Sequence, residues 1–143
     1  LPRIARDLRR LAEAEAAAIA LFPGIPEAID GLHARGGRLA VVSSNSEVAV
    51  RAVLGARAGT FGHFACGASL FGKAAKLRAV VRSQDCAPGR AIYVGDEARD
   101  IAAARAAAIG AGAVAWGYGH PDHLATLRPD RIFARPADLG ALL

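Results

Sequence analysis

Short apolar runs without polar alternation recur along the chain. Such runs are typical of parallel strands that are covered on both faces. They occupy residues 38–42, 91–94 and 113–116, with shorter candidates at 64–67 and 131–133. The first run is preceded by two glycines and followed by a Ser-Ser-Asn-Ser stretch, which marks the end of a strand. The pattern therefore predicts a set of short, buried strands.

Segments with helical periodicity lie between these runs. We expect helices over about residues 2–21, from Pro26 past Leu32, up to Leu54, over 73–83 and from Asp96 to about 109. Ser44 and Glu47 have the spacing of a capping box for the helix that ends at Leu54. Strands that alternate with helices at these lengths predict an α/β fold, a doubly wound parallel sheet with helices on both faces.

The composition is typical of one globular domain with a hydrophobic core. Of the 143 residues, 53% are hydrophobic and 22% are charged, a balance that argues against intrinsic disorder. No run reaches about 18 consecutive apolar residues, so no membrane span is expected. Cys66 and Cys86 are far apart and fit neither a disulfide framework nor a zinc site, which favours a reducing, cytoplasmic setting.

The charge pattern does not indicate a nucleic-acid-binding protein. The net charge is +5, and all but two of the 18 cationic residues are arginines scattered among the predicted helices. An ordinary solvated surface explains this distribution better than a nucleic-acid footprint. The chain begins at Leu1 and contains no methionine, so we expect it to be a piece of a longer protein.

Two predicted strands end in polar residues that could bind a metal ion or a phosphate group. Asp96 and Asp100 follow the run at 91–94, and carboxylate oxygens are the ligands that Mg²⁺ prefers. Ser43, Ser44 and Asn45 follow the run at 38–42, where hydroxyls and free amides suit a phosphate group. In both places simple helix capping is an equally good explanation. Because ligands bind at the carboxyl ends of strands in such sheets, both are candidate sites.

Lys73 is the more specific candidate. The chain uses arginine wherever it needs only positive charge, and its only lysines are Lys73 and Lys76. A compact ammonium acts as a point charge beside a phosphoryl oxygen, where a planar guanidinium fits differently. The competing explanation is a pair of solvated lysines on one helix.

Taken together, these segments resemble the haloacid dehalogenase-like superfamily of phosphotransferases. Residues 41–43 look like its second motif, 71–73 like its third, and 95–100 match its fourth in the form Gly-Asp-x-x-x-Asp. The order and spacing agree over residues 23–143. Further segments, among them 115–118, look like the phosphoglycolate-phosphatase-like branch. The resemblance implies a Mg²⁺-dependent phosphatase for a small phosphorylated metabolite.

The resemblance also implies roles for the candidate residues. Ser43, with Ser44 and Asn45, would bind the transferring phosphoryl group, and Lys73 would neutralise its charge. Asp96 would bind the metal, and Asp100 would hold either Lys73 or a metal-bound water. Such positioning and charge-stabilising roles dominate phosphoryl transfer.

The family's first motif is absent. It is an Asp-x-Asp strand whose first aspartate attacks phosphorus, and no Asp-x-Asp occurs in this sequence. We therefore expect the chain itself to be inactive, because a covalent mechanism needs its nucleophile. By resemblance, residues 1–22 are the last helix of a helical cap and residues 23–143 are the α/β core. The missing strand would lie between the strands that end at Val42 and Val94.

Other functions stay open at this point. One is a non-catalytic fragment or pseudoenzyme that binds phosphate or metal. Another is a receiver-like domain with Asp96 as phosphoacceptor, although the Gly-Asp-x-x-x-Asp context fits the phosphatase motif better. Without a central strand, two apolar strands expected to be fully buried would each lose a partner. Exposed edges of this kind invite self-association.

Overall fold

The computed structural model describes residues 21–68 and 71–143. Its strands are β1 (Leu39–Val42), β2 (Phe61–Ala65), β3 (Ile92–Gly95), β4 (Gly110–Val114) and β5 (Arg131–Phe133). Its α-helices are α2 (Ile25–Ala34), α3 (Glu47–Leu54), α4 (Gly72–Ser83), α5 (Ala98–Ala106) and α6 (Pro121–Thr126). Short 3-10 helices are η1 (Gly55–Thr60), η2 (Pro88–Arg90) and η3 (Pro136–Leu142). Strands and helices alternate, which confirms the predicted fold class.

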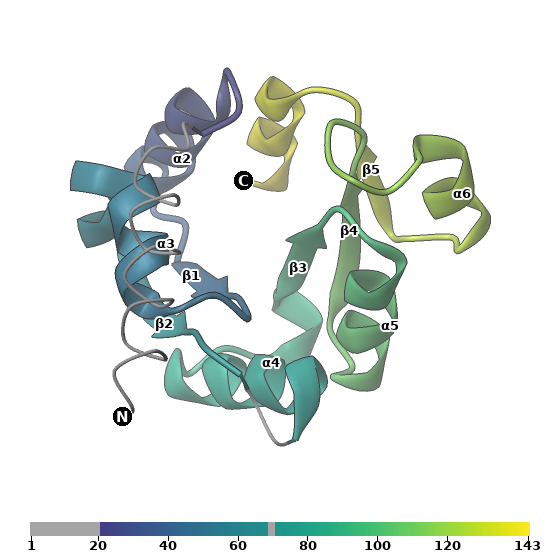
Figure 1. Cartoon of the computed structure of the whole chain (residues 1–143), viewed down its shortest axis with the longest axis horizontal. Coiled ribbons are helices and arrows are strands. Elements are labelled where there is room, and N and C mark those ends of the chain that lie inside the picture. Colours follow the sequence, from purple (N-terminus) through teal and green to yellow (C-terminus); the bar gives the residue numbers. More distant parts are fainter. Residues whose placement is uncertain (1–20, 69–70) are drawn as a thin grey trace, which may run out of the picture.

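All strand pairs are parallel, and they form two separate sheets. β1 pairs with β2, while β4 lies between β3 and β5. Figure 1 shows the two sheets side by side, with β1 and β3 as the strands nearest to the other sheet. Within the described ranges, β1 and β3 therefore each have a backbone partner on one side only. One side chain crosses from one sheet to the other: the Tyr93 hydroxyl donates to the Val42 carbonyl at 3.2 Å.

Both strands beside this junction are less buried than the sequence predicts. The expectation of full burial is wrong for β1 and β3, whose residues are half-buried, with Ala40 exposed. The physical reason is the open edge: a parallel strand is buried fully only when neighbours cover it on both sides and helices cover both faces.

Helices cover both faces of the β3–β4–β5 sheet and create two cores. Because successive side chains of a strand point to opposite faces, Ala111 and Ala113 of β4 face one core and Val114 faces the other. The first core also takes buried residues from α4, α5 and α6: Leu77, Val81, Ile101, Ala104 and Leu124. The second takes Leu32, Phe133 and Leu139 from α2, β5 and η3. α4 also contacts α5, β1 and β2, so it spans the two sheets (Figure 1).

Two strands begin earlier than the sequence pattern predicts. β2 was expected at 64–67 and β4 at 113–116, and each starts three residues sooner. β4 opens with Gly-Ala-Gly-Ala, a poor strand pattern by propensity. The reason is close packing: a Cβ on Gly112 would come within 3.0 Å of the Phe133 ring and 3.3 Å of Val94. Small residues fit β4 because its neighbours fill the space.

The predicted capping box of α3 is also wrong. The N-cap of α3 is Ser46, whose hydroxyl accepts from the Ala49 amide at 3.1 Å. Ser44 lies two residues upstream, outside the helix. Ser46 has the extended backbone that an N-cap requires, directly before the first helical residue.

The remaining helix predictions agree closely with the structure. α4 begins one residue before the expected position and buries Leu77, Val80 and Val81. α2 has Pro26 in its first turn and is followed by Gly36 at φ +83°, the left-handed stop expected there. α5 ends at Ala106 rather than near 109. Residues 2–20 of the helix expected over 2–21 lie outside the described residues. None of the helices inside the described residues could span a membrane.

Candidate active site

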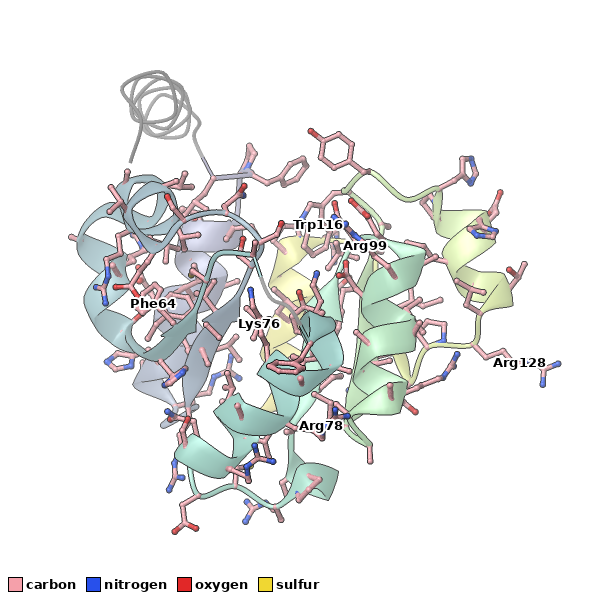
Figure 2. The ribbon with its side chains drawn as sticks, turned by 60° about the horizontal axis from the view of Figure 1, so that its bottom comes forward. Phe64, Lys76, Arg78, Arg99, Trp116 and Arg128 are labelled. Atoms are coloured by element: carbon pink, nitrogen blue, oxygen red, sulfur yellow. The ribbon has the colours of Figure 1, made fainter. Side chains whose placement is uncertain are left out.

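The candidate residues gather at the carboxyl edge of the strands. The strands are parallel within each sheet, so the loops after β1 and β2 emerge together, as do the loops after β3 and β4. Ser44, Gly67 and Arg99, which follow β1, β2 and β3, line one cavity. The first two turns of α4 bring Lys73 and Lys76 to the same place. Figure 2 labels Lys76, Arg99 and Trp116 toward the middle of the molecule.

Asp100 is the most enclosed polar residue of the site. It is 5% exposed, and its Oδ1 pairs with the Lys73 ammonium at 2.6 Å. Its Oδ2 accepts the backbone N–H groups of Asp96 and Glu97, both at 3.1 Å. The second of these bonds is half of a capping box with Glu97 at the start of α5. The helix cap and the counter-ion of Lys73 are thus the same carboxylate.

Gly95 makes room for this carboxylate. A Cβ built on Gly95 would meet Oδ2 and Cβ of Asp100 at clashing distance. The Gly of the Gly-Asp-x-x-x-Asp segment is therefore required sterically, so that the first turn of α5 can fold back onto the end of β3.

The surroundings of Lys73 keep its ammonium charged. Burial alone would lower the pKa of Lys73, but the hydrogen bond that its ammonium donates to Asp100, together with the neighbouring Tyr93, outweighs burial and raises the pKa above its ordinary value. The ammonium also lies 5.4 Å from the centroid of the Tyr93 ring. Burial, with the charge of Asp100, raises the pKa of Tyr93 as well. Lys73 is therefore a fixed positive charge at neutral pH.

Asp96 faces the loop after β4. Its Oδ2 accepts the Tyr118 amide at 3.0 Å, and its backbone carbonyl accepts the Gly119 amide at 2.8 Å. A Cβ on Gly117 would overlap the Asp96 side chain, so glycine allows this close approach. These contacts hold one carboxylate oxygen, and Oδ1 is left without a hydrogen-bond partner in the described part of the chain.

The loop after β1 is joined to the loop after β2. The Ser43 amide donates to the Ala65 carbonyl at 3.1 Å, and the Gly67 amide donates to the Asn45 carbonyl at 2.7 Å. Within the first loop, the Ser43 hydroxyl accepts the Asn45 amide at 3.1 Å. The three residues predicted to bind phosphate therefore lie on a turn whose two ends, Ser43 and Asn45, are both hydrogen-bonded to the segment at the end of β2.

A cavity of about 290 Å³ opens between these loops and α4. It is lined by Ser44, Gly67, Gly72, Lys73, Lys76 and Arg99. Ser44 and Lys73 are predicted site residues, and Ser43 and Asn45 flank Ser44 in the chain. Three cationic side chains around one small cavity favour an anionic occupant.

Sequence reasoning missed three residues of this site. Lys76 lies one helical turn from Lys73, so the i, i+3 spacing could have placed both on one face. Arg99 lies inside the Gly-Asp-x-x-x-Asp segment and pairs with Glu97 at 2.6 Å. Tyr93 gave no signal, because it lies within a continuous apolar run and looks like any core residue of a buried strand.

The site offers oxygen ligands but no preformed cage. Within residues 21–68 and 71–143, no group of three His, Cys, Asp or Glu side chains could hold a metal ion. Mg²⁺ commonly uses one or two carboxylates and completes its shell with water and substrate phosphate. Asp96, with a free oxygen, fits this demand, whereas Asp100 already uses both oxygens on Lys73 and on two amides.

The comparisons with known proteins agree on one family. A model of the haloacid dehalogenase-like hydrolase family matches residues 3–114. A phosphoglycolate phosphatase of Synechococcus elongatus is 34% identical over 125 residues, which is 85% of this chain and 58% of that protein. The chain thus spans less than two thirds of the length of this relative.

Two solved structures align with most of the chain. CbbY from Rhodobacter sphaeroides, determined in complex with phosphate, aligns with a TM-score of 0.81 and 28% identity, covering 98% of this chain and 67% of the other. A haloacid dehalogenase-like hydrolase from Streptococcus pneumoniae aligns with a TM-score of 0.75 and 25% identity, covering 85% of this chain and 59% of that one.

Proposed function

The chain belongs to the haloacid dehalogenase-like hydrolase family, and on that premise we propose that it supplies the phosphate-binding and charge-stabilising half of a phosphatase active site. The substrate class is a small phosphorylated metabolite of the phosphoglycolate type. The name of the Synechococcus elongatus relative and the phosphate bound by CbbY support this choice. The observation that carries it is the buried Lys73–Asp100 pair at 2.6 Å, beside the Ser43–Asn45 turn.

In this proposal each residue acts through position and charge. The Ser43 hydroxyl, the Ser44 amide and the side-chain amide of Asn45 bind the phosphoryl oxygens, while the Asn45 backbone amide stays on the Ser43 oxygen. Lys73 neutralises charge that develops on the transferring group. Asp100 is a positioning residue, because its bonds hold Lys73 and shape the turn that carries Asp96.

Asp96 is the proposed metal ligand, with Mg²⁺ as the metal. When bound, the ion would supply Lewis-acid stabilisation of a phosphoryl oxygen. Asp96 would hold it through the oxygen that Tyr118 does not use, while the Tyr118 amide fixes the carboxylate orientation. The occupied oxygens of Asp100 favour its role on Lys73 over the direct metal ligation also considered from the sequence.

The reaction of the whole enzyme would run through an aspartyl-phosphate. Its nucleophile is not among the residues of this sequence, which contains no Asp-x-Asp. We therefore propose that the 143-residue chain binds phosphate without turning over phosphate esters. The missing motif equally favours a second candidate, a non-catalytic phosphate-binding protein. An Asp-x-Asp strand encoded in frame upstream of Leu1 would favour the phosphatase over that candidate.

Phosphate binding tests the proposal directly. Isothermal titration of the chain with inorganic phosphate in the presence of Mg²⁺ should give a saturable signal. Lys73→Met should weaken binding by about 10- to 100-fold, the value of one charge-assisted hydrogen bond. Arg78→Met is the matched control, since Arg78 leaves the same helix toward the Ala106 carbonyl, away from the cavity. Equal losses in the two variants would contradict the assignment of Lys73.

Turnover is measured in parallel with p-nitrophenyl phosphate and Mg²⁺. We expect no appreciable hydrolysis by the 143-residue chain. Clear activity that disappears in Asp96→Asn would overturn the proposal that the nucleophile lies outside this sequence.

A further inference from the structure

Lys76, the second of the two lysines, makes contacts that its surface position on a helix does not require. It lies in the second turn of α4 and is half-buried. Its ammonium donates to the Ser43 carbonyl at 3.2 Å and to the Gly67 carbonyl. Ser43 ends β1 and Gly67 follows β2, so one side chain of α4 reaches the loops of two different strands.

These two carbonyls belong to the turn that the proposed function uses. The same loops are already joined by the Ser43–Ala65 and Gly67–Asn45 backbone hydrogen bonds. Lys76 adds a third link between the loops, from α4, by donating to one carbonyl in each of them. Gly67 adopts φ +87°, a left-handed backbone that glycine takes without steric cost. An ammonium suits this place, because three N–H donors on a flexible stem can satisfy two carbonyls together.

The charge of Lys76 is used differently from that of Lys73. Lys73 is neutralised by Asp100, whereas Lys76 has no carboxylate within ion-pair distance among the described residues. Its known partners are backbone carbonyls only. The observed contacts therefore assign Lys76 to hydrogen bonding of the backbone, and not to an ion pair within the protein.

We propose that Lys76 is a positioning residue that clamps the two loops and thereby fixes the turn Ser43–Ser44–Asn45 for an anion. This inference rests on the proposed function for the identity of the anion, but the clamp itself is a property of the apo chain. Lys76 acts through the loop backbone, and Lys73 acts on the phosphoryl group. Loss of Lys76 should loosen the turn and so weaken phosphate binding less than loss of Lys73 does.

The test compares Lys76→Met with wild type and with Arg78→Met in the 143-residue chain. Methionine keeps the unbranched stem and removes every N–H donor, and Arg78→Met removes one positive charge from the same helix without touching the loops. Amide hydrogen exchange is followed at Ser43 and Gly67, whose N–H groups make the two bonds between the loops. Phosphate affinity is measured by titration on the same samples.

We expect Lys76→Met to exchange at least several-fold faster at both amides and to bind phosphate about tenfold more weakly, with Arg78→Met unchanged in both. Lys76→Arg, which keeps charge and donors, should restore both readouts. Weaker phosphate binding with unchanged exchange would overturn the clamp in favour of direct charge attraction. Unchanged binding with faster exchange would overturn the positioning role.

Two further outcomes are decisive. If wild type binds no phosphate, the proposed function fails, while the exchange rates at Ser43 and Gly67 still decide the clamp. If Lys76→Met does not fold, Lys76→Gln is measured instead, since its shorter amide reaches one carbonyl and should give smaller changes in the same direction. A Gln variant with wild-type exchange and wild-type affinity would overturn the inference.

Discussion

At the scale of single residues, Asp100 carries two tasks with one carboxylate. It neutralises Lys73 and accepts two amides that begin α5. A carboxylate has two acceptor oxygens, whereas an asparagine amide has one oxygen and one donor group. No orientation of an asparagine can satisfy the lysine and both amides together. Only a carboxylate at position 100 therefore satisfies all three donors, so its replacement should destabilise the fold.

We expect Asp100→Asn to lower the free energy of unfolding by about 1–3 kcal/mol, because it leaves a buried donor unsatisfied and removes a charge-assisted bond. Chemical denaturation measures the change. Asp122→Asn is the control, since the Asp122 side chain is 96% exposed and its contact with His120 is long, at 3.9 Å. If the Asp100→Asn protein is as stable as the control, Asp100 does not both pair with Lys73 and cap α5.

Tyr93 makes the stability of the folded chain depend on pH in the alkaline range. Its pKa is raised in the folded chain above the ordinary value of 10.0, first by burial and then by the charge of Asp100. As pH rises above 10, the unfolded chain loses this proton while the folded chain keeps it. The stability contribution is present below that pH and is lost as pH climbs through the folded pKa. Lys73, with its raised pKa, acts in the same direction.

The chain should therefore lose stability above about pH 10. Tyr93→Phe has no phenol to ionise, so its stability should fall less steeply over the same range. Thermal melts of both proteins in a pH series measure the two slopes. Parallel slopes would mean that Tyr93 ionises equally in the folded and unfolded chains.

At the scale of elements, the true cap of α3 separates two serines that the sequence alone does not distinguish. Ser46→Ala should cost about 1 kcal/mol of stability, because the Ala49 amide loses its acceptor. Ser44→Ala should cost little, since Ser44 lies on the cavity wall. Denaturation of the two variants measures the difference. A larger loss in Ser44→Ala would restore the capping box inferred from the Ser44–Glu47 spacing.

The sequence predicted element types well and element limits less well. Buried apolar runs and the periodicity of α4 were sufficient for the fold class, because these signals come from burial on both faces. The starts of β2 and β4 were missed because residues such as Gly110 and Gly112 have no strand preference of their own. They belong to the strand because they pack against Ile92 and Phe133. These contacts come from distant parts of the chain, so the local sequence does not reveal them.

The same distinction applies to the site. Asp100 as a holder of Lys73 was one of the two roles that the family resemblance implied for this residue. The roles of Lys76 and Tyr93 depend on backbone carbonyls at Ser43, Gly67 and Val42. Backbone acceptors leave no trace in residue identity, so no motif could have pointed to them.

At the scale of the whole molecule, the two sheets meet without pairing. β1 and β3 present open backbone edges within the described ranges, and open apolar edges promote pairing between chains. We expect concentration-dependent self-association, measured by size-exclusion chromatography with light scattering. Ala40→Lys should reduce it, because Ala40 is exposed on β1 and a lysine at an edge disfavours pairing.

A chain that stays monomeric across the accessible concentration range would show that these edges are protected in solution. Equal association of wild type and Ala40→Lys would show that the contact forms through another surface. Both results would leave the fold assignment intact and remove the sheet edge as an interaction surface.

The stack of Phe22 on Trp116 has a practical consequence. The two rings lie 6.0 Å apart and nearly parallel, just before α2 and just after β4 (Figure 2 labels Trp116). Trp116 is the only tryptophan in the sequence, so indole emission comes from this one place at the carboxyl edge. The molecule therefore contains its own optical probe. Separation of the Phe22 segment from the sheet would change the wavelength and intensity of that emission.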